Sequence, residues 1–299
     1  MKILVLDVGG TAIKSAIIDD SDQLSQLRVT PSSADGPQGR IQKAIEIAHG
    51  YDDFDVVSVA MCGQIDDNTR EVLFRYGEPL GSPPFPAGEL LARGIGRPVY
   101  LLNDCNAAAL GEAYFGAGRG QDSFLCLTYG TGVGGGIVQD GRLYTGSRGI
   151  AAEFGHIVTH KGGRLCGCGR RGCYEQYAST TALLRAAKRR YPHLENAKAL
   201  FALAPTEPDL QRIIRAWIDE IVAGLLTLTY IFNPSCILLG GGVMEQESLA
   251  EQIRRRFAQS VIPTFSGLAL RSAQLGNQAG MFGAAVYARQ RLAQTKKTK

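Results

Sequence analysis

The sequence predicts an α/β protein with two lobes, and three observations support that prediction. Segments with strand patterns and segments with helical patterns alternate in both halves of the chain, which is typical of α/β layering. The same device, a strand followed by a glycine-rich turn and a second strand, occurs once in each half, which indicates an internal repeat at the scale of a lobe. The 299 residues are enough to bury the cores of two lobes.

Composition and charge are those of an ordinary globular protein. Apolar residues make up 45% of the chain and charged residues 20%. The formal net charge of +4 is too small to indicate nucleic-acid binding, so we expect no nucleic-acid partner. We interpret the basic runs 188–190 and 254–256 as solvated faces of helices. The 37 glycines are many, which indicates tight turns or backbone that lies close to a ligand.

Nothing in the sequence indicates export or membrane insertion. The first residues predict a short strand instead of a signal peptide, and no apolar run approaches the roughly 20 residues that span a bilayer. We therefore expect a cytoplasmic protein with no membrane partner. Three of the seven cysteines lie within eight residues, and in a reducing compartment such crowding indicates metal binding rather than disulfides.

The spacing of apolar residues, prolines and glycines divides the chain into elements. Strands are predicted at 2–8, 13–19, 24–29, 56–61, 99–102, 123–129, 137–138 and 236–239. Helices are predicted at 40–49, 106–115, 180–190, 209–231 and from about 280 to 293. Prolines make 82–86 a loop, and glycines do the same for 162–173.

Glycines cluster at 115–121, which predicts a hinge between the lobes. We expect an N-terminal α/β lobe of residues 1–117 together with a C-terminal helix at about 280–299. A larger C-terminal lobe of residues 118–279 would carry the cysteine-rich loop.

A carboxylate and two glycines follow the first predicted strand. Asp7 ends that strand, and Gly9-Gly10-Thr11 forms the turn. The backbone N–H groups of such a turn can bind phosphates, with the Thr11 hydroxyl as a further donor. Asp7 could hold a hydrated Mg²⁺ that bridges phosphates. An ordinary Gly-Gly hairpin would have the same sequence.

The second glycine-rich segment, 130–136, reads Gly-Thr-Gly-Val-Gly-Gly-Gly. A dinucleotide-binding fold needs a helix directly after such glycines, but residues 137–144 predict a hairpin. The Walker A pattern is absent from the sequence. The segment therefore predicts a phosphate-binding hairpin of the second lobe. Two such hairpins that face each other would bind a triphosphate between the lobes.

A third glycine segment, Gly240-Gly241-Gly242, follows a predicted strand. It could form a wall against which an adenosine lies with no side chain in the way. A plain turn that begins a helix would have the same sequence.

The pair Asn103-Asp104 stands at the carboxyl end of a buried strand, where ligands collect in α/β sheets. A carboxylate at that place could accept the proton of a sugar hydroxyl that attacks the γ-phosphate of ATP. Asn103 could bind a neighbouring hydroxyl. Alternatively, either residue could be the N-cap of the following alanine-rich helix.

The most specific pattern is a cluster of three cysteines near a histidine. Cys166, Cys168 and Cys173 lie among glycines, and His156 precedes them, so the four residues provide the ligand set of a tetrahedral structural zinc site. His160 is a rival to the preferred His156. Zinc would hold the loop and direct the flanking Glu153 and Glu175 toward the hydroxyls of a ligand, for which carboxylates are good acceptors.

Taken together, these motifs resemble the ROK family of repressors and sugar kinases. The resemblance rests on Asp-x-Gly-Gly-Thr, Asn-Asp-x-Asn-Ala-Ala, Gly-Thr-Gly-x-Gly-Gly-Gly, Glu-x-Gly-His and Cys-x-Cys-Gly-x-x-Gly-Cys-x-Glu, which follow one another from residue 7 to about 180. It implies a two-lobed actin/hexokinase-like ATPase fold with a ribonuclease H-like motif in each lobe. It also implies an ATP-dependent sugar kinase that uses Mg²⁺ and carries structural Zn²⁺. Because members of the family are often dimeric, it further implies a homodimer.

The resemblance assigns a role to each matching position. Asp104 would be the catalytic base. The sugar would be bound by Gly63, Asn103, Asp104, Glu153, His156 and Glu175, and the zinc ion by His156, Cys166, Cys168 and Cys173. The phosphates and their metal ion would lie at Asp7, Gly9, Gly10, Thr11, Thr131 and Gly132, and the nucleoside at Gly241.

Three positions depart from the usual family pattern. Cys62 precedes Gly63 where members usually carry proline, Ala12 follows the first glycine turn where lysine is frequent, and Thr180 stands where glycine is common. None of these changes removes a catalytic group. The first and the last touch the sugar pocket, so they bear on which sugar is used.

The resemblance leaves several sugars open. The expected reaction is phosphorylation of the 6-hydroxyl of glucose, N-acetylglucosamine or N-acetylmannosamine, and a β-glucoside or fructose kinase is the alternative. Repressors of the family carry a DNA-binding segment before the first glycine turn. Asp7 stands too near the start of this sequence to leave room for one, so a sugar-sensing regulator is not expected.

Overall fold

A computed structural model describes residues 1–74 and 79–297, and the chain forms two compact units. Unit 1 comprises Met1–Gly120, Gly136–Ala151 and Asn277–Lys299, and unit 2 comprises Gln121–Gly135 and Ala152–Gly276. The lobe boundaries predicted above, 1–117 with 280–299 and 118–279, remain a proposal.

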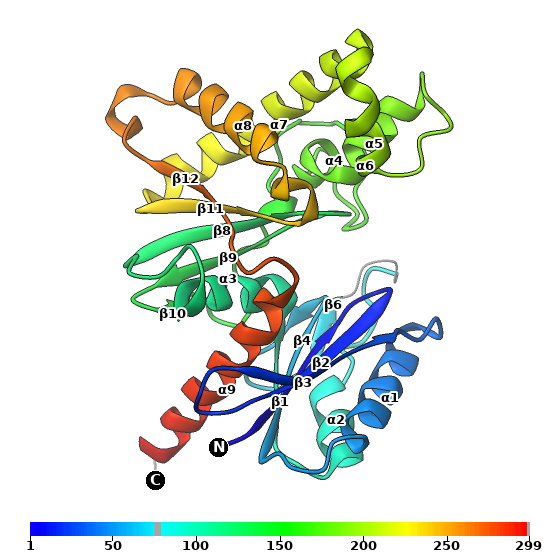
Figure 1. Ribbon diagram of the computed structural model, residues 1–299, viewed down its shortest axis with the longest axis vertical. Coiled ribbons are helices and arrows are strands. Elements are labelled where there is room, and N and C mark those ends of the chain that lie inside the picture. The colour runs from blue at the N-terminus through cyan, green and yellow to red at the C-terminus, as the bar shows by residue number, and fades with distance from the viewer. Residues whose placement is uncertain (75–78, 298–299) are drawn as a thin grey trace. The chain divides into compact units, whose positions relative to one another are not determined.

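Unit 1 is built around one sheet with helices on both faces (Figure 1). Its elements are β1 (Ile3–Val8), β2 (Ala12–Ile18), β3 (Leu24–Pro31), α1 (Gly36–His49), β4 (Val56–Met61), β5 (Gln64–Ile65), β6 (Val72–Phe74), α2 (Ala87–Ile95), β7 (Val99–Asn103), α3 (Asp104–Phe115), β10 (Arg142–Leu143) and α9 (Ala279–Lys297).

The strand order of this sheet is β3–β2–β1–β4–β7. The Gly9-Gly10 turn lets β1 return as β2, and β3 continues the antiparallel meander. β4 and β7 then run parallel to β1. All six residues of β4 are buried, as expected for an inner parallel strand that is covered on both faces.

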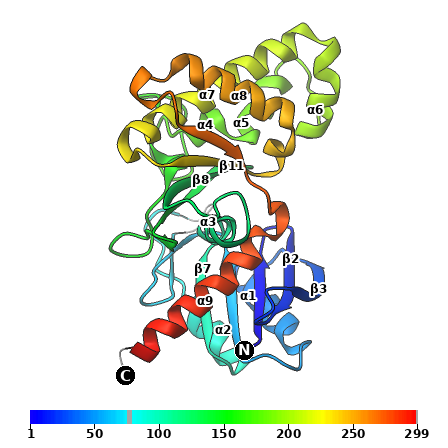
Figure 2. The ribbon, with the colours of Figure 1, turned by 60° about the vertical axis from the view of Figure 1, so that its left-hand side comes forward.

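Alternate residues of β1 pack against different helices, because successive side chains of a strand point to opposite faces. Leu4 and Leu6 belong to the core formed with α1 and α2. Ile3 and Val5 belong to the core formed with α3 and α9. Both views show α9 beside α3 (Figures 1 and 2), and a Cβ on Gly283 would collide with the backbone of α3.

Unit 2 carries most of the second sheet, and β9 (Val133–Gln139) leads the chain from unit 2 into unit 1. The other elements are β8 (Ser123–Tyr129), η1 (Phe154–His156), α4 (Glu175–Ala178), α5 (Thr180–Lys188), α6 (Ala197–Leu203), η2 (Ala204–Thr206), α7 (Pro208–Phe232), β11 (Cys236–Gly240), η3 (Gly242–Glu245), α8 (Glu247–Ser260), η4 (Pro263–Phe265), β12 (Ala269–Ser272) and η5 (Gly276–Gln278).

The second sheet repeats the order of the first. Its strands follow as β10–β9–β8–β11–β12. In the first sheet β1 has β2 and β3 on one side and β4 and β7 on the other. In the second sheet β8 likewise has β9 and β10 on one side and β11 and β12 on the other. β11 runs parallel to both β8 and β12. The internal repeat predicted from the two glycine turns is therefore present in the strand order.

The starts of three predicted elements are wrong, for local reasons. The first helix begins at Gly36 and not at residue 40, with a proline in its first turn. β9 begins at Val133, inside the glycine run, and not at residue 137, because Val133 and the glycines after it extend as strand. The helix expected from residue 106 begins at Asp104, since Asn103 caps it. The elements β5, β6, α2, α4, α6 and β12 were not among those predicted, whereas α8 is the helix expected to carry the basic run 254–256.

Within residues 1–74 and 79–297, no helix has both the length and the apolar character that crossing a membrane requires.

Candidate active site and metal centre

The first glycine turn is tight at one end and open at the other. The Gly9 N–H donates to the carbonyl of Ala12 over 3.1 Å, and a Cβ on Gly9 would lie only 2.9 Å from that oxygen. Nothing lies within 4 Å of the point that a Cβ on Gly10 would occupy, and Gly10 and Thr11 are exposed. The turn is thus accessible to a ligand, as a phosphate site requires.

The Asp7 carboxylate is half-buried at the end of β1. Lys14 lies opposite it in the antiparallel register of β1 and β2, with 3.3 Å between Lys14 Nζ and Asp7 Oδ2. Burial raises the pKa of Asp7, and the charge and hydrogen bond of Lys14 oppose that shift. A Cβ on Gly280 of α9 would lie 3.5 Å from the carboxyl carbon of Asp7, which is an ordinary van der Waals contact, so the start of α9 packs beside the carboxylate.

Asn103 joins two loops at the carboxyl ends of neighbouring strands. Its Nδ2 donates to the carbonyl of Gly63 over 3.1 Å, and its Oδ1 accepts from the backbone N–H groups of Cys105 (2.8 Å) and Asn106 (3.0 Å). Gly63 is buried and has a φ of 126°, a backbone conformation that favours glycine. The cap anticipated for this pair is therefore Asn103, and it holds the Gly63 loop in addition.

Because Asn103 is the N-cap of α3, Asp104 is not needed for that role. Asp104 is the first residue of α3, is half-buried, and accepts from the Cys105 N–H over 2.9 Å. Burial raises the pKa of the Asp104 carboxyl, and the negative charge of Asp7 raises it further. The two carboxylates thus stand near one another at the same edge of the sheet. A raised pKa brings a carboxylate closer to the range in which a general base works well at neutral pH.

The second glycine hairpin packs closely on the segment around Glu153 and on Glu175. A Cβ on Gly132 would lie 2.6 Å from Glu175 Oε2, and one on Gly135 would collide with the ring of Phe154. Thr131 is exposed at the turn. The glycines of this hairpin therefore make room for the residues that flank the cysteine cluster.

The third glycine turn lies against the start of that hairpin. Gly241 has a φ of 95°, and a Cβ on it would collide with the backbone of Tyr129, the residue before Gly130. Nothing lies within 4 Å of a Cβ on Gly242. Position 241 requires glycine because the backbone of Tyr129 lies so close to it. Gly242, in contrast, faces open space.

The four predicted metal ligands lie together. The ligand atoms of His156, Cys166, Cys168 and Cys173 are all within 4.8 Å of one another. Cys168 Sγ and Cys173 Sγ are 3.5 Å apart, and Cys166 Sγ lies 3.7 Å from His156 Nδ1. A tetrahedral zinc ion bound to sulfur and nitrogen has ligand atoms separated by about 3.6–3.8 Å. The donor set and its spacing therefore fit this ion.

The rival histidine takes a different place. The ring of His160 stacks on Tyr177, with ring centroids 3.8 Å apart, and its Nε2 lies 3.5 Å from Glu220 Oε1. Burial lowers the pKa of His156, which favours the neutral imidazole that binds metals. The geometry favours His156 over His160 as the fourth ligand.

The two flanking glutamates contact the cluster from different sides. Glu153 Oε2 is 3.7 Å from His156 Nε2, the ring nitrogen that does not face Cys166. Glu175 is buried, and its Oε1 accepts from Cys166 Sγ over 3.1 Å. Glu175 is thus held by Cys166 of the cysteine loop, and Glu153 lies beside His156.

Residues 3–291 match the sequence pattern of the ROK family. The chain belongs to the ROK family.

Two relatives extend over almost the whole ROK chain. The glucokinase of Streptomyces coelicolor is 35% identical over 95% of this chain and 96% of its own length. The N-acetylmannosamine kinase of Salmonella typhi is 31% identical over 96% and 98%. A solved ROK family glucokinase from Streptomyces griseus, in complex with glucose and AMPPNP, is 33% identical, covers 97% of this chain and 100% of that one, and gives a TM-score of 0.86.

The predicted activity and fold are confirmed at this level. This ROK protein is an ATP-dependent carbohydrate kinase with a small-molecule sugar substrate. Its fold is the two-lobed actin/hexokinase-like fold.

The predicted site residues of the ROK chain lie in different units. Unit 1 holds Asp7, Gly9, Gly10, Thr11, Gly63, Asn103 and Asp104. Unit 2 holds Thr131, Gly132, Glu153, His156, Cys166, Cys168, Cys173, Glu175 and Gly241.

Sequence reasoning did not connect Lys14 with Asp7. The signal was present, because a two-glycine turn places Asp7 and Lys14 opposite each other in an antiparallel pair. It also missed the buried contact of Tyr129 with Tyr174, which are 45 residues apart and carry no local pattern.

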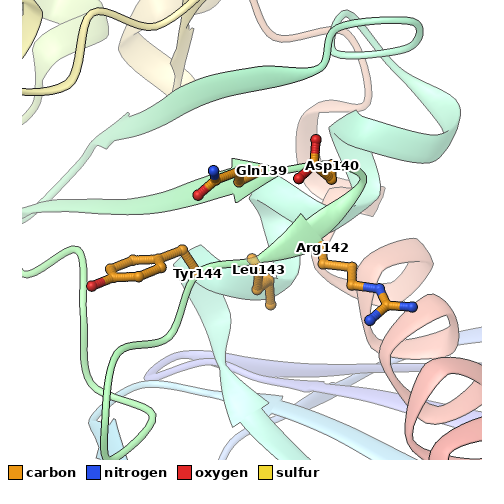
Figure 3. A pocket seen from close by; sticks show the side chains of 5 residues that line it. All are labelled: Gln139, Asp140, Arg142, Leu143 and Tyr144. Carbon is orange, nitrogen blue, oxygen red and sulfur yellow. The ribbon is translucent and has the colours of Figure 1, made fainter.

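A surface hollow of about 430 Å³ lies on the β9–β10 hairpin (Figure 3). Gln139, Asp140, Arg142, Leu143 and Tyr144 line it. None of these residues belongs to the predicted site.

Proposed function

We propose that this chain transfers the γ-phosphoryl group of ATP to the 6-hydroxyl of a hexose or N-acetylhexosamine, with Asp104 as the general base. The observation that carries the proposal is the state of Asp104. It stands at the carboxyl end of β7, it is not the residue that caps α3, and burial and Asp7 raise its pKa.

The proposed step conserves atoms and charge. Asp104 accepts the proton of the sugar hydroxyl as the hydroxyl oxygen forms its bond to the γ-phosphorus. The bond from that phosphorus to the bridging oxygen breaks, and ADP leaves with the electron pair. Such a transfer depends mainly on positioning and on stabilisation of charge, so the placement of the base and of the phosphates matters most.

Asn103 would bind the sugar together with the backbone of Gly63, which Asn103 already holds in place. Glu153, Glu175 and His156 are the other proposed sugar ligands. The two ring nitrogens of His156 have different neighbours, because Nδ1 lies 3.7 Å from Cys166 Sγ and Nε2 lies 3.7 Å from Glu153 Oε2.

The phosphates would contact the turns at Gly9, Gly10, Thr11, Thr131 and Gly132, and the nucleoside would lie at Gly241. Asp7 would hold hydrated Mg²⁺, which neutralises charge on the phosphates. His156 and the three cysteines would hold structural Zn²⁺, which keeps the loop in place. A cytoplasmic homodimer is part of the same proposal.

We propose glucose as the first substrate to test, with N-acetylmannosamine and N-acetylglucosamine next. The choice follows the Streptomyces coelicolor glucokinase at 35% identity and the Salmonella typhi N-acetylmannosamine kinase at 31%. Cys62 beside Gly63 distinguishes this pocket from the usual family pattern, and it bears on the order of preference.

The test is a coupled assay of ADP release over a panel of glucose, N-acetylglucosamine, N-acetylmannosamine, fructose and a β-glucoside. Wild type is expected to turn over at least one of the first three sugars. Asp104→Asn should lower kcat by roughly 10²–10⁴-fold, the usual contribution of a general base.

Asp104→Asn is a clean variant because the amide oxygen can still accept from Cys105 and because Asn103 still caps α3. Asp53→Asn, at an exposed position of the same unit, is the matched control and should keep wild-type turnover. Unchanged kcat in Asp104→Asn would remove Asp104 from its role, and turnover confined to fructose or the β-glucoside would overturn the substrate class.

A further inference from the structure

Two buried tyrosines connect two proposed ligand-binding segments. One is the end of the cysteine loop, residues 173–175, which carries the proposed sugar ligand Glu175, and the other is the proposed phosphate hairpin, residues 130–136. Tyr129 and Tyr174 are fully buried, and their hydroxyl oxygens are 2.9 Å apart. The Tyr174 hydroxyl donates to the carbonyl of Ile221 on α7 over 2.8 Å. Since each hydroxyl has one hydrogen, Tyr129 must be the donor to Tyr174. The result is a chain of two hydrogen bonds that ends on the main chain of a long helix.

Each tyrosine stands directly beside a functional segment. Tyr129 ends β8 and precedes Gly130, the first residue of the phosphate hairpin. Tyr174 lies between Cys173, a predicted metal ligand, and Glu175, a predicted sugar ligand. A shift of either loop therefore moves one member of the pair.

The surrounding packing leaves the pair little freedom. A Cβ on Gly224 of α7 would collide with the ring of Tyr174, and a Cβ on Gly241 would collide with the backbone of Tyr129. The two rings meet edge to face, with centroids 6.5 Å apart and an interplanar angle of 83°. Tightly packed groups of this kind respond to displacement as a unit.

Two further contacts run along the same path. The Thr180 N–H donates to the Gly130 carbonyl over 2.9 Å, and Glu175 Oε2 lies against Gly132. The hairpin and the loop are thus joined at three places within unit 2. Of these, the tyrosine pair can be altered by removing a single oxygen atom.

We propose that the Tyr129–Tyr174 hydrogen bond positions Glu175 and the 130–136 hairpin relative to each other, and so couples sugar binding to nucleotide binding. The inference rests on the proposed function, because it takes Glu175 as a sugar ligand and the hairpin as a phosphate site. Both tyrosines are positioning residues. Ordering of Glu175 by a sugar would order the hairpin in advance of the nucleotide.

The experiment measures the dissociation constant of AMPPNP with and without saturating glucose, or another panel sugar that wild type turns over faster. Titration calorimetry on the full-length chain provides both values. In wild type the sugar should tighten AMPPNP binding by about fivefold or more, the lower end of usual coupling between sites. Nucleotide should tighten sugar binding by the same factor, because coupling is reciprocal.

Tyr129→Phe is the informative variant. It keeps the ring and leaves the bond from Tyr174 to Ile221 intact, so we expect a folded protein whose coupling factor falls to less than about half of the wild-type value. Its affinity for AMPPNP alone should stay within about twofold. Tyr174→Phe removes both hydrogen bonds and should lose the coupling as well. If Tyr174→Phe does not fold, the result for Tyr129→Phe decides the outcome.

A purely structural role would not change the coupling factor. Ile253→Val, in the buried part of α8, is the control, since it weakens packing in the same unit away from both loops and should keep the wild-type factor. A wild-type factor in Tyr129→Phe would overturn the inference, and so would a factor near one in a wild type that phosphorylates sugar. A wild type that phosphorylates no sugar of the panel would instead overturn the proposed function.

Discussion

Glu175 Oε2 lies 2.6 Å from the point that a Cβ on Gly132 would occupy. No side chain fits at position 132 unless the carboxylate moves. The same carboxylate accepts from Cys166 through its other oxygen. One buried glutamate thus contacts a proposed metal ligand on one side and the proposed phosphate hairpin on the other.

Gly132→Ala should therefore displace Glu175. A Cβ at less than 3 Å forces the carboxylate away, so we expect the KM for sugar to rise by roughly tenfold or more, about 1.4 kcal/mol of lost binding. Steady-state kinetics with sugar and ATP varied separately will measure it. Gly267→Ala is the control, because nothing lies within 4 Å of a Cβ at that loop position. Equal sugar KM values in the two variants would contradict the prediction.

The acid limb of the pH–activity profile should follow the pKa of the Asp104 carboxyl. Burial and the charge of Asp7 raise its pKa, so the deprotonated base is lost on acidification at a higher pH than for an ordinary aspartate of about 3.9. Asp7→Asn removes the neighbouring negative charge and should move the acid limb of kcat/KM to lower pH, whatever it does to the maximal rate. The measurement is kcat/KM against pH, because that ratio reports the free enzyme, in which Asp7 holds no Mg²⁺.

In that comparison Asp53→Asn, which changes an exposed and distant carboxylate, should leave the acid limb where wild type has it. A limb in Asp7→Asn that stays in place, or that moves to higher pH, would show that Asp7 does not act on the base through its charge.

Zinc binding should be stoichiometric and local in its effect. We expect about one zinc ion per chain by elemental analysis, from the tetrahedral set of three cysteines and His156. Cys168→Ser should lower the zinc content and raise the KM for sugar by at least about tenfold, the scale on which weakened metal sites lose function. The KM for ATP should change less.

Cys236→Ala is the matched control for the zinc experiment. This cysteine is buried in β11 and lies outside the group of four, so the variant should keep its metal even if it loses some stability. Full zinc content in Cys168→Ser, or zinc loss in Cys236→Ala, would contradict the assigned ligand set.

Ala152 lies at a passage of the chain between the units and has a φ of 69°, in the left-handed region. Gly120 (φ 72°) and Gly276 (φ 48°) stand at two other passages, so Ala152 occupies a conformation for which glycine is used elsewhere. The left-handed backbone costs alanine about 1–2 kcal/mol. Ala152→Gly relieves this strain but frees the unfolded chain, so the free energy of unfolding should stay level or rise by up to about 1 kcal/mol.

Urea denaturation will measure that change. Ala258→Gly, at an exposed position inside α8, is the comparison and should lower the free energy of unfolding by about 0.5–1 kcal/mol. If both variants are destabilised equally, position 152 carries no strain. Ala152→Val should be the least stable of the three, because β-branched residues tolerate positive φ worst.

Much of the fold could be read from local patterns. Apolar runs between glycines marked β1, β4 and β8 almost to the residue, and the repeat of strand, turn and strand indicated an internal repeat, which the structure shows as two sheets of the same order. The elements that escaped prediction include short ones such as β12, which has four residues. β12 is ordered by its parallel pairing with β11, from which it is separated along the chain by all of α8.

The sequence by itself determined which groups are available: three cysteines and a histidine with the donor atoms of a zinc site, the carboxylate after β7, and the glycine-rich turns. These features follow from the side chain or the absence of one, so each is fixed position by position. Only the tertiary structure decided that Asn103 and not Asp104 caps α3, that Lys14 lies beside Asp7, and that Tyr129 meets Tyr174. Such contacts depend on where distant segments pack, and packing is settled by the whole chain at once.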